Sequence, residues 1–443
     1  MSAQDVGARP LPELGPPDGA GEPSSPGGAA TAVTLYLVVL LAVPSRLVVG
    51  PLGSAGAPSM LLGLLALAWW GLLLLTRKEA ARRLFFLPVR WGLGALLLVS
   101  GISYALAMSR PINPDEVSPA DVSLLALLSW AGVMLFTTDH LTGRRGIDAV
   151  VWRVAMAGGI LAALGLVQFL FKVSVADVIR IPGLTEVSQG GVYYRNGLVR
   201  PNGTATHPIE YGAIMAMMLP IALHVAIYHV RRSPVLRWGA VLAIIAVVGV
   251  SGSRSAYVCT VAGVLVCFFV WPPLLRRWLV SLGVLGVGLV ALVWPRMTRI
   301  IVSLFDNPEA DPSITSRTDS FDFAWAFTAQ HPWFGRGTGT FLPKYRIFDN
   351  QYLVQLVSVG TLGVTALVAL AVVAMSQMRR VAREANLVGD LRVRDLAGSL
   401  SGAVLAGFVS MAFFDAFAFP MTMGTLFLLL GLVGAVARMK GQA

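Results

Sequence analysis

The amino-acid sequence predicts an all-α polytopic membrane protein with about 12 transmembrane helices and two long extracytoplasmic loops. Of its 443 residues, 56% are hydrophobic and only 13% are charged, whereas roughly 25% are charged in an ordinary soluble domain. The apolar residues form blocks of about 20, the length that a helix needs to cross the hydrocarbon core of a bilayer. Short charged or Pro- and Gly-rich stretches separate these blocks.

The N-terminal stretch, 1–31, is rich in Pro, Gly, Ala and Ser and has no basic segment followed by an apolar core. This composition predicts a disordered cytoplasmic tail and not a secretory signal. We divide the remainder into an N-terminal transmembrane region (32–239), a core (240–375) and C-terminal helices (376–443). The predicted spans, with boundaries uncertain by about 3 residues, are 32–50, 58–76, 91–108, 120–138, 149–171, 209–229, 237–252, 255–271, 278–294, 351–375, 396–414 and 420–436.

Positive charge is concentrated in one set of short loops. These loops contain the Arg and Lys residues of 77–90, 144–145, 231–237, 276–277, 379–394 and 438–440. Short loops rich in cations face the cytoplasm. An even number of spans therefore places both termini in the cytoplasm. We expect the protein to lie in the plasma (inner) membrane, with lipids as partners. The opposite loops include two long ones, 172–208 and 295–350, which we expect to be ordered and extracytoplasmic.

Several classes of function are disfavoured by what the sequence lacks. The net charge of +11 follows from the loop charges and accompanies no nucleic-acid-binding motif. There is no P-loop for ATP, and Cys259 and Cys267 lie too far apart in one predicted helix to form a disulfide. No Cys and His cluster predicts a metal, and Asp115-Glu116 is only a weak alternative. His224 is the one ionisable candidate inside a span, which disfavours an ion-coupled transporter.

The first candidate site precedes the sixth predicted span. The segment from Arg195 to Tyr211 contains Arg200, His207 and Glu210 and leads directly into a helix. The N-terminal end of a helix carries free N–H groups and a partial positive charge, which favour an anion. We therefore expect a functional cluster at the outer membrane surface, and interfacial snorkelling of arginine is the simpler alternative.

The second candidate is Arg254, which follows Ser253 in a short connection between two spans. Such a connection holds the guanidinium at the outer interface. A cation fixed there by two helices is costly unless an anion pairs with it. The alternative is a marker of topology, but a positive residue outside the membrane runs against the loop-charge rule.

The third candidate is the long loop before the tenth predicted span. Its first part, 316–327, predicts an amphipathic helix with Arg317 near its start. The aromatic residues expected on one side of this helix are Phe321, Trp325 and Phe327. A Gly-rich bend at 335–339 follows, and Asp349-Asn350-Gln351-Tyr352-Leu353 then leads into the span. The simpler alternative is that these aromatic residues lie at the membrane–water interface without a functional role.

Taken in order, these motifs resemble those of the O-antigen ligase and Wzy-polymerase superfamily of bacterial membrane proteins. The matching segments are Arg200 to Pro208, Ser253-Arg254, Arg317 to Trp325, Pro332 to Phe341, Asp349 to Leu353 and Gly360 to Gly363. Each motif alone is weak, but their order, spacing and placement make the set specific. In one departure, the histidine of the family falls on Asp349, whose carboxylate can also accept a proton.

The resemblance implies a GT-C-like membrane glycosyltransferase whose donor is a glycan on a polyprenyl diphosphate carrier. The acceptor would be a glycan, a glycolipid or a protein, and the reaction either ligation or polymerisation. Guanidinium groups bind phosphate through two parallel N–H bonds. The expected diphosphate-binding residues are Arg200, Arg254 and Arg317.

A carboxylate or an imidazole would deprotonate the acceptor hydroxyl. The expected proton acceptors, in order of preference, are Asp349, Glu210 and His207. We expect direct displacement with inversion, with no cofactor and no metal. The competing hypothesis is a transporter or flippase of lipid-linked saccharides, which a dozen helices would fit equally well.

Overall fold

Helices make up most of the chain, as predicted. The computed structural model describes residues 27–76, 87–188, 190–195, 197–293, 295 and 312–440. The helices are α1 (Gly27–Ala42), α2 (Pro58–Thr76), α4 (Pro88–Met108), α5 (Pro114–His140), α6 (Arg144–Phe171), α7 (Pro208–Tyr228), α8 (Pro234–Val250), α9 (Arg254–Val270), α10 (Pro273–Val293), α12 (Pro312–Thr328), α13 (Gln351–Leu387), α14 (Leu391–Ser410) and α15 (Pro420–Lys440). The shorter elements are β1 (Leu47–Val49), β2 (Leu184–Glu186), β3 (Tyr193–Arg195), β4 (Leu198–Arg200), η1 (Gly50–Gly56), η3 (Val175–Val178) and η4 (Ala416–Ala418).

Seven helices of the described residues are long and apolar enough to cross a membrane. They are α2, α4, α5, α6, α7, α13 and α15. The remaining predicted spans coincide with α1, α8, α9, α10 and α14, so every predicted span overlaps a helix. The all-α class of a multi-pass membrane protein is therefore confirmed. The count of about 12 crossings stays a prediction.

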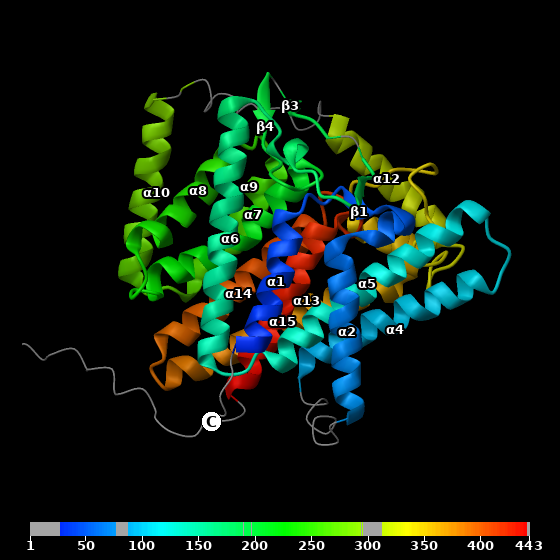
Figure 1. Ribbon diagram of the computed structural model, residues 1–443, viewed down its shortest axis with the longest axis horizontal. Helices are drawn as coiled ribbons and strands as arrows, with labels where there is room; N and C mark the ends of the chain where they lie inside the picture. Colours follow the sequence, from blue (N-terminus) through cyan, green and yellow to red (C-terminus); the bar gives the residue numbers. More distant parts are fainter. Residues whose placement is uncertain are drawn as a thin grey trace, which may run out of the picture.

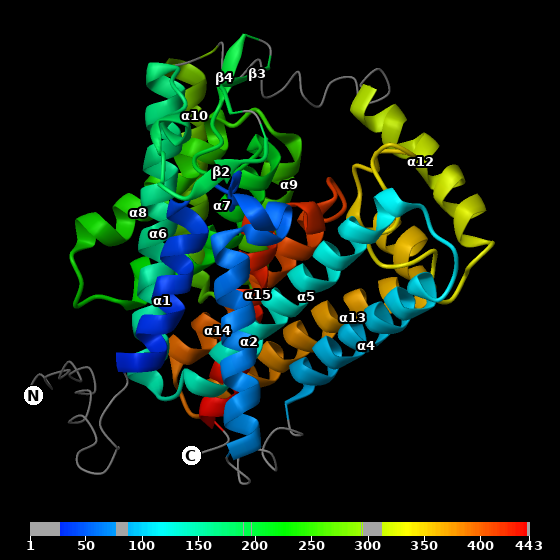
Figure 2. The ribbon, with the colours of Figure 1, turned by 45° about the vertical axis from the view of Figure 1, so that its right-hand side comes forward.

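The first helix begins earlier than predicted. α1 starts at Gly27, four residues before the expected end of the tail, and residues 1–26 lie outside the described part of the chain. Ala29 and Ala30 extend the helix because alanine has the highest helix propensity. α1 begins and α15 ends at the same end of the bundle (Figure 2).

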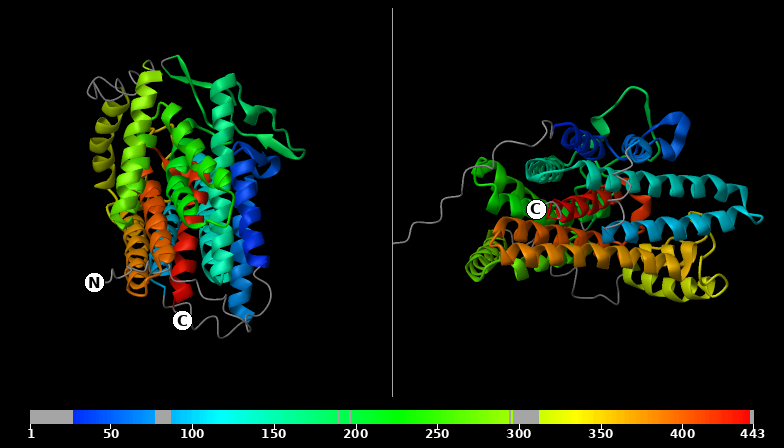
Figure 3. Two further views of the ribbon diagram at one scale, coloured as in Figure 1. Left: turned by 90° about the vertical axis from the view of Figure 1, so that its left-hand side faces the viewer. Right: turned by 90° about the horizontal axis from the view of Figure 1, so that it is seen from below.

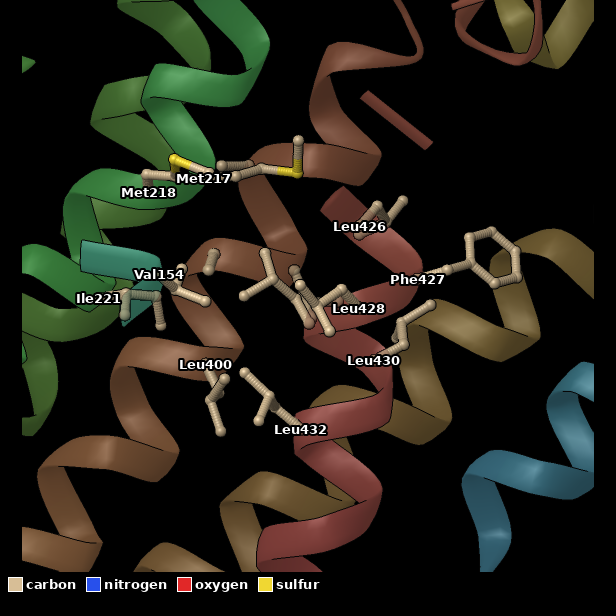
Figure 4. Packing of buried hydrophobic residues seen from close by; sticks show 14 of the residues in the cluster. Val154, Met217, Met218, Ile221, Leu400, Leu426, Phe427, Leu428, Leu430 and Leu432 are labelled. Carbon is tan, nitrogen blue, oxygen red and sulfur yellow. The ribbon is translucent and has the colours of Figure 1, made fainter. Parts of the chain in front are cut away.

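The core of the bundle is formed by helices that are apolar on all sides. α15 runs through the middle of the molecule, with α5, α7, α13 and α14 packed around it (Figures 1 and 3). Figure 4 shows Met217 and Ile221 of α7 and Leu400 of α14 packed with Leu426 and Leu428 of α15. A helix that is hydrophobic all round is buried against neighbours on every side. This rigid centre positions the chain segments that connect the helices.

The β-strands and α12 lie at one end of the bundle, which we call the loop-bearing end (Figure 2). β1 pairs with β2, and β3 pairs with β4, in two antiparallel two-stranded sheets. The helices α7, α9, α13 and α15 all begin at this end. Four helix N-termini, each with a partial positive charge, therefore meet where the predicted site residues lie.

The Gly-rich bend is inserted into a break in α13. Gly360 has φ 78° and ψ −171°, so α13 consists of two helical segments. The backbone groups freed by this break bond to the bend: the N–H of Gly337 donates to the carbonyl of Ser358 at 2.8 Å, and that of Thr361 donates to Pro332 at 2.8 Å. A Cβ on Gly360 would lie 2.4 Å from the carbonyl oxygen of Trp333. Close backbone approach explains why both segments contain glycine.

A buried carboxylate fastens this loop to α5. Glu116 is 1% exposed. It accepts hydrogen bonds from Arg336 and from the hydroxyl of Tyr345, each at 2.5 Å. The neighbouring Asp115 pairs with Lys344 at 2.6 Å. The Asp115-Glu116 pair, which the sequence left open as a metal site, thus holds the loop between α12 and α13.

The predicted helix at the start of the long loop is present as α12, but its predicted apolar side is wrong. Phe321 and Trp325 are 52% and 70% exposed. Phe327 instead packs edge-to-face on Phe341, at 5.6 Å between ring centroids, and stacks with Phe323 at 5.4 Å. Residues four positions apart share one side of a helix, whereas positions 321 and 327 are about 120° apart around the helix axis. The side that packs against the protein is that of Phe323 and Phe327.

Candidate functional site

Arg200 connects the β3–β4 hairpin with the turn before α9. Its Nε donates to the carbonyl of Ser251 at 3.4 Å, three residues before Arg254 begins α9. Burial, together with the charge of Arg195, lowers the pKa of Arg200 to about 10, so its guanidinium is still protonated at neutral pH. The structure therefore brings Arg200 onto the segment that carries Arg254, as the motifs predicted. Partial burial strengthens the attraction of such a cation for an anion.

His207 lies beside Arg200 as the N-cap of α7. Its Nδ1 accepts the N–H of Ile209 at 3.2 Å, and its ring packs edge-to-face on Tyr193 at 5.1 Å. Burial and the charge of Arg200 lower the pKa of His207 to about 4, so the ring is neutral at pH 7. Because Nδ1 accepts a hydrogen bond, the proton of the neutral ring is on Nε2. His207 is thus arranged to donate a hydrogen bond to an anion rather than to accept a proton.

Glu210 is sequestered from any substrate. Its side chain has no solvent exposure and accepts the N–H of Thr206 at 2.8 Å and that of Met421 at 3.1 Å. Through these bonds it joins the N-termini of α7 and α15. The side chain of Glu210 thus connects two helices. It is the least accessible of the three expected proton acceptors, because it is completely buried.

Asp349 lies at the start of α13, directly before the N-cap residue Asn350. Its side chain is half-buried. The N–H of Gln351 donates to the carbonyls of Met411 at 2.7 Å and Phe414 at 3.1 Å. The connection between α14 and α15 (411–419) is therefore bound to the beginning of α13, and Figure 2 places it between α9 and α12.

Asp415, in this connection, was not singled out from the sequence. Burial and the charge of Asp349 raise the pKa of Asp415 to about 6, so the two carboxyl groups lie close enough to interact. The residues are 66 positions apart, with most of α13 and α14 between them. The only signal in the sequence is an acidic residue between the last two apolar blocks.

The site consists of two halves. We call Arg195, Arg200, Arg254 and His207 the basic half, and Asp349 and Asp415 the acidic half. Phe419 of the α14–α15 connection lies near the basic half: its ring centroid is 6.5 Å from that of His207 and 5.2 Å from that of Phe414, the residue before Asp415. Arg317 falls within α12, but its side chain lies outside the described residues.

The fold and the site are those of a mainly helical, multi-pass membrane protein with polar groups gathered at one end of the bundle. The model of the O-Antigen ligase family matches residues 239–368. This range includes Arg254, the Gly-rich bend and Asp349, and it covers less than a third of the 443 residues. The resemblance inferred from the motifs is therefore confirmed for this part of the chain. No curated protein matches the chain.

Proposed function

We propose that the protein is a membrane glycosyltransferase of cell-surface polysaccharide assembly. It transfers or polymerises a glycan from a polyprenyl diphosphate onto an acceptor hydroxyl at the outer face of the plasma (inner) membrane. The observation that carries this proposal is the two-part site. Arg200 reaches the turn that leads to Arg254, Asp349 lies at the start of α13, to which the α14–α15 connection is bonded, and the family match includes both Arg254 and Asp349.

The basic half fits a departing diphosphate. The glycosyl–phosphate bond breaks with its electron pair, so negative charge develops on the phosphate oxygen. Arginine stays charged and offers paired N–H donors, and the Nε2–H of His207 adds a neutral donor. Preorganised donors aimed at developing charge lower the barrier of such a reaction. Because the donor is already activated, no nucleotide hydrolysis is needed, and we propose no cofactor.

The acidic half fits the acceptor. In a direct displacement the nucleophile attacks the anomeric carbon from the side opposite the leaving group, so the base and the phosphate-binding groups lie on opposite sides of the sugar. We propose that Asp349 lies on one side of the sugar and Arg200 and His207 on the other; in support, the α14–α15 connection contacts His207 through Phe419 and the start of α13 through Gln351. Asp349 would take the proton of the acceptor hydroxyl as the new bond forms. The expected product has the inverted anomeric configuration.

Turnover of a polyprenyl-diphosphate-linked oligosaccharide by the purified protein in proteoliposomes tests this proposal. We expect release of polyprenyl diphosphate together with a glycan joined to the acceptor, and roughly 100-fold less of both products with Asp349→Asn. A flippase would instead move a fluorescent donor across the bilayer with its diphosphate bond intact. That result would replace the proposal by the transporter hypothesis.

Accessibility of introduced cysteines tests the location of the site. We expect Val178→Cys and Gln330→Cys, exposed positions in the two long loops, to react with an impermeant thiol reagent on intact cells. Val388→Cys, exposed at the opposite end of the bundle, is the matched control and should react only after permeabilisation. Cys259 and Cys267 are buried and give a low background. The reverse pattern would place the site in the cytoplasm and contradict the proposal.

A further inference from the structure

The acidic half is built by two segments that are bonded to each other. Besides the bonds from the N–H of Gln351 to the carbonyls of Met411 and Phe414, the side-chain oxygen of Gln351 accepts the N–H of Phe417 at 2.9 Å. These three bonds link Gln351 to residues on both sides of Asp415 in the chain, so the turn that contains Asp415 is bonded to the start of α13. The position of Asp415 beside Asp349 therefore follows from specific backbone contacts and not from chance proximity.

Among the described residues, both carboxyl groups lack an ion-pair partner: neither Asp349 nor Asp415 forms a salt bridge. Of the charged or titratable groups on the surrounding segments, Arg346 is directed to Ser320 and the ring of Phe323. Further groups near these segments are the neutral His207, beyond Phe419, the buried Glu210 below the start of α15, Tyr352, which bonds to the carbonyl of Phe408, and Arg254 at the start of α9. Burial is the larger influence on the Asp415 carboxyl, and the charge of Asp349 adds to it.

We propose that Asp415 acts together with Asp349 as one proton-accepting unit for the acceptor hydroxyl. This inference rests on the proposed function. As the acceptor oxygen bonds to the anomeric carbon, its proton passes to a carboxylate oxygen of the pair. The glycosyl–phosphate bond breaks, and its electron pair leaves with the diphosphate, which the basic half binds. The proton then passes to water, which restores the pair.

The second carboxylate explains how an aspartate can stand where the family has a histidine. An isolated aspartate, with a pKa of about 3.9, is a weak base at neutral pH. Two adjacent carboxylates disfavour each other's charge, so the pair binds its first proton at a higher pH. Burial, with the charge of Asp349 added to it, raises the pKa of Asp415 to about 6. The pair approaches the basicity of an imidazole and is still ionised at pH 7.

The pH dependence of turnover tests the pair. In the parent, activity should fall below about pH 6, where the pair binds its first proton. Asp415→Asn removes the carboxyl group with the raised pKa, so the acidic limb should move to lower pH by about 1 unit. The maximal rate should fall about tenfold, because the remaining base is weaker. Asp415→Glu should keep the acidic limb in place.

Asp322→Asn, at an exposed carboxylate of α12, is the matched control and should leave the profile unchanged. A normal rate and profile for Asp415→Asn would overturn the inference. So would a reduced rate with an unmoved acidic limb, because that result indicates structural support only. Difference infrared spectroscopy supplies a readout without turnover: a carboxyl protonating near pH 6 should vanish in Asp415→Asn and should protonate at lower pH in Asp349→Asn. Absence of that signal in the parent refutes the pair, whereas absence of turnover refutes the proposed function.

Discussion

The His224–Asp395 pair and the Asp349–Asp415 pair, at opposite ends of the bundle, differ in the groups that face each other. At the end opposite the loop-bearing one, a carboxyl group faces a basic residue: His224 lies 2.6 Å from Asp395, and Arg392 lies 2.9 Å from Asp148. At the loop-bearing end, Asp349 and Asp415 have no ion-pair partner among the described residues. Removing one partner of a buried ion pair destabilises the fold, because the other group is left without a partner. Ionisable groups with shifted pKa values and no ion-pair partner are instead candidates for a functional role. Mutations at the two ends should therefore be distinguishable by what they change.

The largest effect on stability should come from the opposite end. Asp395→Asn removes the carboxylate that holds His224 inside the bundle, where both side chains are at most 3% exposed. Breaking a buried pair by removing one partner should cost about 3 kcal/mol. We expect a clear fall in the midpoint of thermal unfolding in detergent, with turnover per folded molecule unchanged. Loss of turnover at unchanged stability would instead give this pair a functional role and break the comparison.

The largest effect on rate should come from Asp349→Asn, which keeps the shape of the side chain and removes its basicity. We expect turnover to fall roughly 100-fold or more, with a thermal midpoint close to that of the parent because no ion pair is lost. Near-normal turnover would contradict the assignment of Asp349 as proton acceptor.

Lysine should not replace the arginines of the basic half. Arg200→Lys and Arg254→Lys keep the charge but lose the planar pair of donors. Loss of one good charge-assisted contact should cost about 2–3 kcal/mol, or roughly 30- to 150-fold, and should reduce kcat more than donor affinity. Arg180→Lys, at an exposed loop position, is the control. If both site variants turn over like the parent, these arginines are interfacial anchors.

Glu210→Gln should behave like a mutation of the opposite end although it lies near the site. The amide can accept only one of the two backbone N–H bonds that Glu210 receives. We expect a loss of about 1–2 kcal/mol in stability and little change in turnover per folded molecule. A rate fall of about 100-fold with unchanged stability would identify Glu210 as the base.

The smallest effect should come from His207→Asn, which keeps an N-cap acceptor and an N–H donor. Because the pKa of His207 is about 4, the ring is neutral at pH 6–8, so its replacement should leave the pH profile unchanged there. We expect turnover within about threefold of the parent, whereas His207→Ala should lose about 1 kcal/mol of stability with the cap. A strong rate loss in the Asn variant would make His207 a base.

The comparison also separates what the sequence could predict from what it could not. Apolar blocks predicted the helices, and motif order predicted that Arg200 and Arg254 belong to one site. The partner of Asp349 could not be predicted, because Asp415 reaches it only through the packing of α13 against α14. The burial of Glu210 likewise depends on the distant start of α15. Helical spacing could have corrected one error, since Phe321 and Phe327 cannot share a face of α12.

The anomeric configuration of the product tests the central claim most directly. If the basic and acidic halves act on opposite sides of the sugar, transfer occurs in one displacement. NMR of the product from a donor of known configuration should then show inversion at the transferred carbon. Retention of configuration would require a covalent glycosyl intermediate or attack from the side of the leaving group, and would contradict the two-part site.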